Sequence, residues 1–370
     1  MKSLVSILDE LTSVGELVET LPDGAVRCLA CAHRCRLKPG QRGICQVRFN
    51  QEGSLRVPWG YVAALQADPI EKKPFSHLLP GAVALTFGML GCDFHCGYCQ
   101  NWLTSQAVRD PAAEVAANLV RRLTPQEVIQ AARRAQAEVV VASYNEPLIT
   151  SEWAVSIFRE AKRMGLKCAY VSNGHATPEA LEYLSPYLCA YKVDLKAMRE
   201  KTYQSLGGKL KPVLETIQKA HDLGLWVEVV TLVVPGLNDN PEELFEAARF
   251  LASVSKEIPW HLTAFHPDYQ MTDPENTPLK TLLRAAEIGQ EAGLNYVYVG
   301  NLPGQAAGYE DTHCPQCHRI LIRRRGYQVE ENHLNGEGKC PSCGRQVAGI
   351  WAEKPRPGRR AESTLPRGVY

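Results

Sequence analysis

A chain of 370 residues is long enough for one large domain with one or two small ones beside it. Hydrophobic residues make up 45% of the sequence, and the formal net charge of +1 excludes a strong overall field that would attract nucleic acid or an anionic membrane surface. The sequence has no apolar run that approaches the ~18–20 residues of a membrane span, so we expect no membrane partner.

The first twenty residues, MKSLVSILDELTSVGELVET, interleave Leu4, Leu8, Leu11 and Val18 with acidic residues, which predicts an amphipathic helix. The stretch lacks the apolar core and cleavage site of a signal peptide, and we therefore expect a cytoplasmic protein. In a reducing cytoplasm, the thirteen cysteines of the chain indicate metal ligands rather than disulfides.

The first cysteine group lies in the segment CLACAHRCRLKPGQRGIC. Its four thiols, at spacing C-x2-C-x3-C-x9-C, are Cys28, Cys31, Cys35 and Cys45. Four soft ligands on a loop-rich segment predict a metal site. The sequence leaves three states open: bound zinc, a second iron–sulfur cluster able to feed electrons inward, and reduced thiols without metal.

From about residue 82, seven short apolar runs alternate with amphipathic stretches. The runs span 82–90, 138–144, 167–173, 189–195, 226–234, 260–265 and 295–300. Such runs are typical of parallel strands buried on both faces. Helix start signals, a capping residue before a proline, occur at Thr124, Thr177, Asn240 and Thr277. The alternation predicts right-handed βαβ units in a barrel-like α/β domain.

Polar residues and glycines follow the apolar runs at one end of each. These segments are Cys92, YNEP (144–147), SNGH (172–175), DLK (194–196), PGLND (235–239) and HPDY (266–269). In a parallel barrel the C-terminal ends of the strands converge on one mouth, where active sites lie. The pattern therefore predicts an enzyme, and it makes His266 a candidate substrate contact or a structural histidine.

The loop GMLGCDFHCGYCQNW carries Cys92, Cys96 and Cys99 at spacing C-x3-C-x2-C. Structural zinc and electron-transfer iron–sulfur clusters take four protein ligands. Three thiolates on one loop can hold three corners of a cubic 4Fe–4S cluster and leave the fourth iron open to another ligand. The alternative is a zinc site that His95 or a distant residue completes.

The stretch GCDFHCGYCQNW resembles the signature loop of the radical SAM superfamily. The resemblance implies a partial (β/α)6 barrel, in which a reduced 4Fe–4S cluster cleaves S-adenosylmethionine (SAM) to methionine and a 5′-deoxyadenosyl radical that abstracts a hydrogen atom. It makes Cys92, Cys96 and Cys99 the cluster ligands, and it places Tyr98 over the cluster and near the adenine. It also implies a reductant such as flavodoxin or ferredoxin as a partner.

The same resemblance assigns residues in the other loops. Glu146, in Asn-Glu-Pro where many members have Gly-Gly-Glu, takes the position of the acidic residue that binds the SAM amino group, and its alternative role is a charge at a helix N-terminus. Ser172 and Asn173 are candidates to bind the ribose hydroxyls or the carboxylate. Asp194 and Lys196, two apart on a strand, point the same way into the mouth, where a plain salt bridge is the alternative.

Two stretches narrow the resemblance: DPIEKKPFSHLLPG (68–81) and TFGMLGCDFHCGYCQNW (86–102). They are similar to pyruvate formate-lyase activating-enzyme-like proteins and, among these, to the radical SAM member of the AmmeMemoRadiSam system, which implies a protein substrate or system partners. The resemblance covers about residues 25–300. Many glycyl-radical activases carry extra ferredoxin-like cysteines after the signature loop, whereas this chain has its additional cysteines at the two ends, which counts against that role.

The last cysteine group is Cys314, Cys317, Cys340 and Cys343. Two C-P-x-C knuckles separated by twenty-two residues are typical of a zinc ribbon. Metal binding supplies folding energy that a segment of ~50 residues lacks. The basic residues between the knuckles, Arg319 and 323–325, either contact nucleic acid or form a solvated turn.

We therefore predict an N-terminal helix and Cys-rich segment (1–75), a radical SAM barrel (76–308), a zinc-ribbon-like module (309–352) and a flexible tail (353–370). The predicted activity is SAM cleavage and hydrogen abstraction from an unidentified substrate. One rival is a glycyl-radical activase. The rival from another class is a metal-stabilised nucleic-acid-binding protein, against which the net charge near zero argues.

Overall fold

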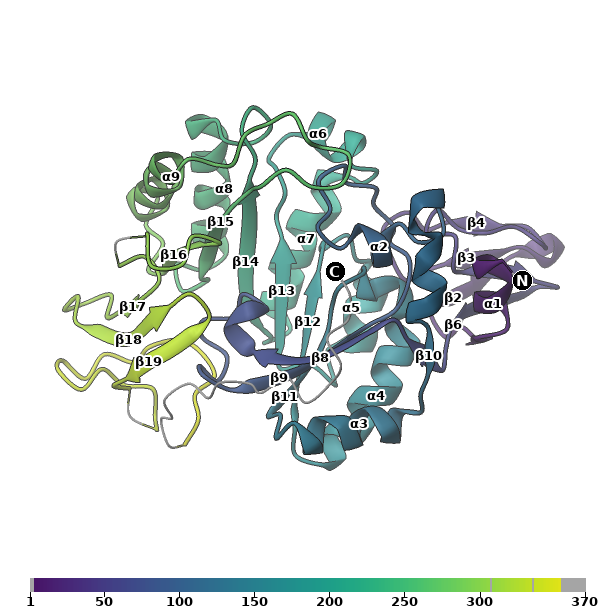
Figure 1. The fold of residues 1–370 in the computed structure, drawn as a ribbon, viewed down its shortest axis with the longest axis horizontal. Coiled ribbons are helices and arrows are strands. Elements are labelled where there is room, and N and C mark those ends of the chain that lie inside the picture. Colours follow the sequence, from purple (N-terminus) through teal and green to yellow (C-terminus); the bar gives the residue numbers. More distant parts are fainter. Residues whose placement is uncertain (1–2, 307, 335, 354–370) are drawn as a thin grey trace.

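The computed structural model describes residues 3–306, 308–334 and 336–353, and Figure 1 shows their arrangement. The tail predicted at 353–370 lies outside the described residues except for Glu353. Within the described ranges, each helix is too short or too polar to cross a lipid bilayer.

The centre of the protein is a sheet with seven parallel strands. They are β9 (Val83–Gly88), β11 (Val139–Ala142), β12 (Lys167–Ser172), β13 (Ala190–Asp194), β14 (Trp226–Val233), β15 (Trp260–Ala264) and β16 (Val297–Gly300). Neighbours in the chain are neighbours in the sheet, and β8 (Ala64–Pro69) adds an antiparallel strand beside β9. Each parallel strand lies within one predicted apolar run, which confirms those predictions.

The burial of the strands explains why the runs are so continuously apolar. Every residue of β9, β11 and β15 is buried, as expected of parallel strands that are covered on both faces. The structure thus confirms a mixed α/β fold with a parallel sheet. Closure of this sheet into a partial (β/α)6 barrel stays a prediction.

Helices connect the consecutive parallel strands and flank the sheet (Figure 1). They are α2 (Trp102–Ser105), α3 (Pro125–Arg134), α4 (Ser151–Arg163), α5 (Pro178–Leu184), α6 (Glu200–Ser205), α7 (Leu210–Asp222), α8 (Pro241–Val254) and α9 (Leu279–Glu291). Short 3-10 helices are η1 (Pro22–Gly24), η2 (Ile70–Lys72), η3 (Pro111–Leu119) and η4 (Pro147–Thr150). The side chains of Thr124, Thr177 and Asn240 cap α3, α5 and α8 as predicted.

Thr277 is not the helix cap that its position before a proline predicted. Helix α9 begins one residue later, and its N-cap, Pro278, makes no side-chain hydrogen bond. The Thr277 hydroxyl instead donates to the carbonyl of Val233 at 2.6 Å and accepts the N–H of Phe265 at 2.8 Å. It therefore ties together the loops that leave β14 and β15.

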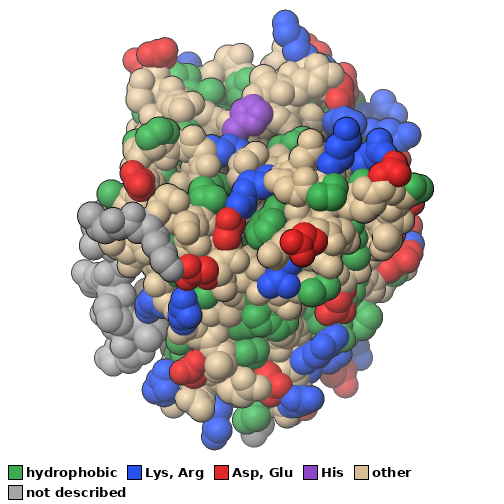
Figure 2. Space-filling view, turned by 90° about the vertical axis from the view of Figure 1, so that its right-hand side faces the viewer, with side chains coloured by type: hydrophobic (Ala, Val, Ile, Leu, Met, Phe, Trp, Pro, Cys, Tyr) green, Lys and Arg blue, Asp and Glu red, His purple; other side chains and the backbone are tan. Residues whose placement is uncertain are grey.

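The N-terminal region is mostly β structure rather than the single long helix that residues 1–20 predicted. Helix α1 (Leu4–Asp9) is followed by β1 (Thr12–Val14), β2 (Val18–Thr20), β3 (Val26–Cys28), β4 (Arg36–Leu37), β5 (Phe49–Gln51), β6 (Ser54–Pro58) and β7 (Tyr61–Val62). Two three-stranded sheets result, β1-β6-β5 and β2-β3-β4, and β7 pairs with β10 (Arg121–Arg122). On the face of this end that Figure 2 shows, basic and acidic side chains are interspersed.

Packing explains why the helix prediction is wrong beyond Asp9. A Cβ atom at Gly15 would come within 2.7 Å of the Val57 side chain, so the backbone here lies flush against β6. The apolar residues Leu11 and Leu17 are buried, but they serve these small sheets. An irregular series of apolar and acidic residues fits a helix face and a short meander equally well.

The C-terminal region is a three-stranded antiparallel sheet of β17 (Thr312–His313), β18 (Ile320–Arg325) and β19 (Gln328–Asn332). Its core includes Tyr296 and Tyr298, which come from the end of the central sheet. Ile350 also exchanges backbone hydrogen bonds of 2.7 Å with His77 and Leu79. The region therefore shares its core with the sheet beside it.

Candidate active site and metal-binding cysteines

The three central cysteines lie in the loop between β9 and α2, at the C-terminal end of the first parallel strand. Cys96 is buried, and Cys92 and Cys99 are partly buried. Burial raises the pKa of the Cys96 thiol to about 12, so without a metal this group is a neutral thiol. A bound cation is what converts such a group to the thiolate that ligates metal.

Small residues on a distant turn hold the three-cysteine loop in place. The Phe94 ring lies over Gly208, where an added Cβ would meet it at 2.1 Å, and the His95 ring lies over Gly207 in the same way at 2.5 Å. The N–H of His95 donates to Leu206 at 2.9 Å. The three thiols and His95 are not among the described groups whose ligand atoms all lie within 4.8 Å of one another. The cluster and the zinc site that the sequence left open at this loop both stay predictions.

Side chains from outside the predicted set also position the loop. Gln106 and Arg109 both donate to the carbonyl of Phe94, at 3.2 and 2.8 Å. The hydroxyl of Ser105 lies 3.2 Å from the sulfur of Cys99. Sequence reasoning missed these residues, although all three fall within a few positions of the motif.

Asp93, directly after the first cysteine, is a fully buried residue that the sequence analysis did not single out. Its Oδ1 accepts a 2.7 Å hydrogen bond from Asn173, and its Oδ2 lies 3.1 Å from Nδ1 of His175. Burial opposes ionisation, but His175, His33 and Asn173 outweigh it and lower the pKa of Asp93. The structure thus places an ionised carboxylate behind the cysteine loop.

Glu146 lies at the end of the strand after the cysteine loop and is 3% exposed. Its Oε1 accepts the Ser172 hydroxyl at 2.8 Å and the N–H of Leu148 at 3.0 Å, and its Oε2 accepts the N–H of Asn173 at 2.7 Å. The contact with Leu148 caps η4, as the alternative role predicted. Burial and the charge of Asp93 raise the pKa of Glu146 to about 8. The predicted residues Glu146, Ser172 and Asn173 are therefore together, beside the carboxylate of Asp93.

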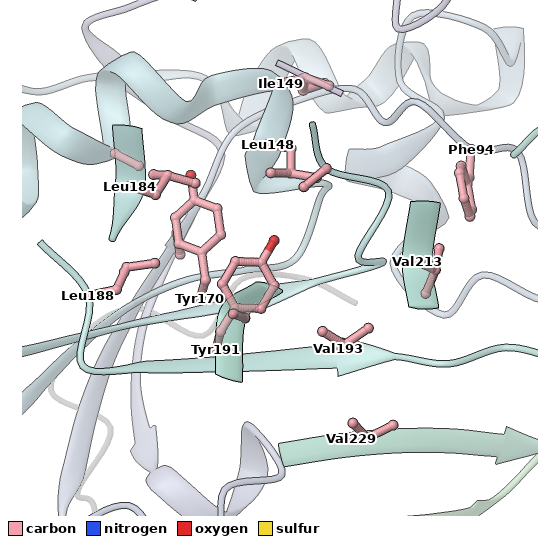
Figure 3. Packing of buried hydrophobic residues seen from close by; sticks show 14 of the residues in the cluster. Phe94, Leu148, Ile149, Tyr170, Leu184, Leu188, Tyr191, Val193, Val213 and Val229 are labelled. Carbon is pink, nitrogen blue, oxygen red and sulfur yellow. The ribbon is translucent and has the colours of Figure 1, made fainter. Parts of the chain in front are cut away.

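The core beneath this corner is rigid and aromatic. Tyr170 and Tyr191 lie with ring centroids 5.7 Å apart among the buried leucines of Figure 3. The Tyr170 hydroxyl donates to the carbonyl of Pro147 at 2.9 Å. This bond fixes the start of η4 and with it the Glu146 side chain.

Asp194 and Lys196, at the end of β13, form the salt bridge that was the alternative to a binding role, with Nζ and Oδ2 3.4 Å apart. Lys192, which sequence reasoning missed, bonds the other carboxylate oxygen. Burial opposes the charge of Lys196, but Asp194, Cys96 and Tyr98 raise its pKa. The pair therefore adjoins the second cysteine and the buried Tyr98.

The loop that follows β15 covers the cysteine loop from the other side. The N–H of Gln270 donates to the carbonyl of Gly97 at 2.9 Å, and the Tyr269 ring stacks on Trp102 at 5.1 Å between centroids. His266 is exposed, and its Nε2 lies 2.9 Å from the side-chain amide of Gln100. The predicted mouth segments after β9, β11, β12, β13 and β15 thus surround one region.

The C-terminal cysteines form a tight group. The sulfurs of Cys314 and Cys343 lie 3.5 Å apart, those of Cys317 and Cys340 lie 3.7 Å apart, and all four are within 4.8 Å of one another. The basic stretch between the knuckles is not one exposed patch: Arg324 is buried and donates to the carbonyl of Ser76 at 2.7 Å. This burial removes one predicted nucleic-acid contact.

The N-terminal cysteines lie beside Asp93 and His175, next to the three-cysteine loop. Cys28, Cys31 and Cys45 are buried, Cys35 is partly buried, and the N–H of Cys28 donates to the carbonyl of Cys35 at 3.0 Å. Cys31 also belongs to a second tight group, in which its sulfur, a carboxylate oxygen of Asp93 and a ring nitrogen of His175 lie within 4.8 Å of one another. Nothing in the local spacing of the cysteines signals this long-range contact.

The parallel sheet and the three-thiol loop at its strand ends define an α/β protein with a candidate metal centre at one edge of the sheet. The sequence model of the radical SAM superfamily matches residues 87–251, which include the loop. The chain is also 37% identical over 332 residues to an uncharacterized protein of Methanocaldococcus jannaschii, a match that covers 89% of this chain and 97% of that protein. The chain belongs to the radical SAM superfamily.

Other similarities cover less of the chain. The pyruvate formate-lyase-activating enzyme of Staphylococcus epidermidis is 25% identical over 184 residues, which are 48% of this chain and 72% of that enzyme. A radical SAM methyltransferase from Sphaerobacter thermophilus, with 18% identity, has a TM-score of 0.47 over 60% of this chain and 67% of its own.

Proposed function

We propose that this protein holds a 4Fe–4S cluster on Cys92, Cys96 and Cys99, binds SAM at the fourth iron, and cleaves it to methionine and a 5′-deoxyadenosyl radical that abstracts a hydrogen atom from a substrate. The observation that carries the proposal is the three-thiol loop at the end of β9, within the residues that match the superfamily model. When bound, the cluster supplies the electron that breaks the bond between sulfur and C5′ of SAM. An external donor such as flavodoxin or ferredoxin supplies that electron first.

The corner of Glu146, Ser172 and Asn173 is the proposed site for the amino-acid part of SAM. Two buried carboxylates, those of Glu146 and Asp93, adjoin the loop, and burial together with the charge of Asp93 raises the pKa of Glu146. An ammonium group brought beside Glu146 would form charge-assisted hydrogen bonds with its carboxylate. Ser172 and Asn173 orient the carboxylate through their hydrogen bonds to it.

On the opposite side of the loop, Asp194, Lys196 and Tyr98 are the proposed contacts to the rest of the cofactor. The charge of Lys196 is available beside Cys96 because the Asp194 pair keeps it ionised. Tyr98 is buried next to both and closes this side against water. Its ring is the proposed neighbour of the adenine.

The test is anaerobic purification with iron and sulfide quantified, followed by assay of 5′-deoxyadenosine under dithionite. Replacing Cys92, Cys96 and Cys99 together by alanine is expected to abolish 5′-deoxyadenosine formation and the SAM-dependent change in the spectrum of the reduced cluster. Unchanged SAM cleavage in that triple variant contradicts the proposal.

We further propose zinc for Cys314, Cys317, Cys340 and Cys343, in a zinc-ribbon-like module (309–352) attached to a partial barrel (76–308). Four thiolates around one zinc, with Zn–S bonds of ~2.3 Å, stand about 3.8 Å apart at tetrahedral angles. Sulfur separations of 3.5 and 3.7 Å fit that arrangement. None of the thirteen cysteines, all of which lie among the described residues, is paired in a disulfide, which supports the proposal of a reducing, cytoplasmic location.

A glycyl-radical activase is the second candidate, favoured by the similarity to the Staphylococcus epidermidis enzyme. In that case the hydrogen atom comes from a glycine of a protein partner. Incubation of the reduced protein and SAM with pyruvate formate-lyase tests it, because a glycyl radical gives a characteristic paramagnetic signal. If 5′-deoxyadenosine is still released but that signal is absent, pyruvate formate-lyase is not the substrate.

A further inference from the structure

We infer that Cys28, Cys31, Cys35 and Cys45 hold a second 4Fe–4S cluster, distinct from the one proposed for the three-cysteine loop and separated from it by little more than the Asp93 side chain. The inference goes beyond the proposed function, which needs only the central loop. It stands on four features of the described residues: the folding of the segment, the donors to its sulfurs, a buried cation, and the spacing of the thiols.

The segment is folded so that Cys28 lies close enough to Cys31, Cys35 and Cys45 to act on their charges. Strand β3 ends at Cys28, and the chain returns through β4 with a backbone hydrogen bond between Cys28 and Cys35. Tight turns follow Cys31 and Cys45, where Arg34 and Gln46 have φ of 45° and 65°. Residues other than glycine adopt such angles only when the surroundings fix them. The surrounding residues therefore fix the backbone conformation of both turns.

Backbone amides donate to the sulfurs in the manner of the central loop. There the N–H of Phe94 donates to the sulfur of Cys92, two residues earlier, at 3.3 Å. The N-terminal group repeats this arrangement at Cys31 and Cys45, whose sulfurs accept from the amide two residues later. Hydrogen bonds to the sulfurs are among the features by which a protein tunes a bound iron–sulfur cluster. The sulfur of the isolated Cys168 instead faces a backbone carbonyl at 4.0 Å.

A buried guanidinium lies beside the thiols. Arg48 is 1% exposed, and its two Nη atoms bind the Glu152 carboxylate at 2.8 and 2.7 Å. Its Nε is buried and has no hydrogen-bond partner among the described residues. Cys28 and Cys45 are close enough to act on its charge. A cation there, with one donor unused, suits the negative charge of a four-thiolate cluster.

The distances between the sulfurs distinguish a site for a cluster from a site for a single ion. The C-terminal four draw together within 4.8 Å, as the thiolates around one zinc must. Among the described residues, no three of the N-terminal cysteines meet that distance, and neither do the three of the central loop. In a cubic cluster each thiolate binds a different iron, so the sulfurs stand farther apart. The N-terminal group and the central loop therefore both lack the close packing of sulfurs that the C-terminal four show.

Asp93 lies between the two sites and is close to a cysteine of each. Cys31 lies within 4.8 Å of an Asp93 carboxylate oxygen, and Oδ1 of Asp93 lies 3.9 Å from the sulfur of Cys92. The His33 ring nitrogen lies 3.3 Å from the carbonyl of Asp93. Two reduced clusters so placed are close enough for their unpaired electrons to interact magnetically.

The experiment measures metal in the full-length protein after anaerobic reconstitution with iron and sulfide. We expect about eight iron atoms per chain, and about four, with equal sulfide, in the triple variant Cys92→Ala, Cys96→Ala, Cys99→Ala. We expect about four also in the double variant Cys28→Ala, Cys45→Ala. The control Cys168→Ala keeps about eight. Dithionite reduction should give a broadened, interacting spectrum only when both cysteine groups are intact.

Three outcomes overturn the inference. A triple variant without iron or sulfide but with about two zinc ions per chain makes the N-terminal group a zinc site. The same variant with about one zinc ion and no iron leaves these thiols free of metal. Metal retained in Cys28→Ala, Cys45→Ala but lost in His175→Ala assigns it to Cys31, Asp93 and His175. None of these results depends on SAM cleavage, so the proposed function is tested separately.

Discussion

The two four-cysteine groups at the ends of the chain have the same ligands but opposite surroundings. The C-terminal group is drawn within 4.8 Å, and Cys317 is exposed to solvent. The N-terminal group is spread out and mostly buried, and it adjoins the active-site wall through Asp93 and His175. A count of cysteines and their spacing in the sequence therefore do not by themselves determine the role of such a group. The residues that pack around the cysteines determine this role, because they fix how far apart the sulfurs stand and which charges face them.

The C-terminal group should respond most strongly to the loss of its cysteines. Replacing Cys314 and Cys340 by alanine should release the zinc ion proposed there and unfold β18 and β19, because structural zinc sites contribute about 10–16 kcal/mol of apparent binding free energy. Zinc analysis and hydrogen exchange check this. The control Cys189→Ala should keep both zinc and protection. If β18 stays protected after the zinc is lost, packing on Tyr298, and not the metal, holds the module.

A smaller effect is expected at the N-terminal group. Arg48→Met leaves the Glu152 carboxylate buried without its partner, and the free energy of unfolding should fall by about 3–5 kcal/mol. The double variant Arg48→Met, Glu152→Leu should recover much of this loss, since neither charge is then buried. Arg27→Met, which breaks an exposed pair with Glu19, should change stability by less than about 1 kcal/mol. Equal losses in Arg48→Met and Arg27→Met would refute the argument.

The third effect concerns how the C-terminal module is attached. Burial raises the pKa of Glu71, which faces Arg324 at 3.8 Å, to about 7. The folded state therefore binds more protons than the unfolded state between about pH 4.5 and 7, and stability should fall as pH rises through that window, by up to about 3 kcal/mol. Denaturant unfolding at several pH values measures it. Glu71→Gln should flatten this dependence, and an equal slope in both proteins assigns it to other groups.

The smallest effect is expected at Glu146, and it tests the role of the corner that this residue forms with Ser172 and Asn173. Glu146→Ala should weaken SAM binding by roughly 1.5–3 kcal/mol, the scale of a hydrogen bond to a charged group, while iron content stays the same. Isothermal titration of the anaerobic protein checks this. Glu114→Ala, an exposed carboxylate on η3, is the matched control and should bind SAM normally. Loss of iron in Glu146→Ala would mean that the residue supports the fold of the loop.

Much of the fold could be predicted because its signals are local. Seven apolar runs and three capping residues that precede a proline correspond to strands and helices, since burial on both faces and helix capping act over a few residues. The N-terminal prediction was wrong because the series Leu4, Leu8, Leu11, Val18 satisfies two periodicities, and the close approach of Gly15 to Val57 decides between them. Thr277 has the sequence of a cap, but a tertiary hydrogen bond to Val233 takes its hydroxyl.

The residues of the candidate site also divide into those with a local sequence signal and those without one. The cysteines, Glu146 and Asn173 follow from motif and position at the strand ends. Asp93 could not be found from the sequence, because its importance lies in contacts with residues about 80 positions away. The contact of Cys31 with the same carboxylate is equally remote in the chain, so the position of the N-terminal group beside the active site was hidden.

The turn of Gly207 and Gly208 shows how an active site extends beyond its motif. No ligand comes from this turn, yet a single methyl group at Gly208 would collide with the Phe94 ring at 2.1 Å and push the three-cysteine loop aside. A survey of disabling substitutions would therefore find sensitive positions more than a hundred residues after the motif. For anyone who grafts the loop into another scaffold, the flat surface of these two glycines has to be transplanted with it.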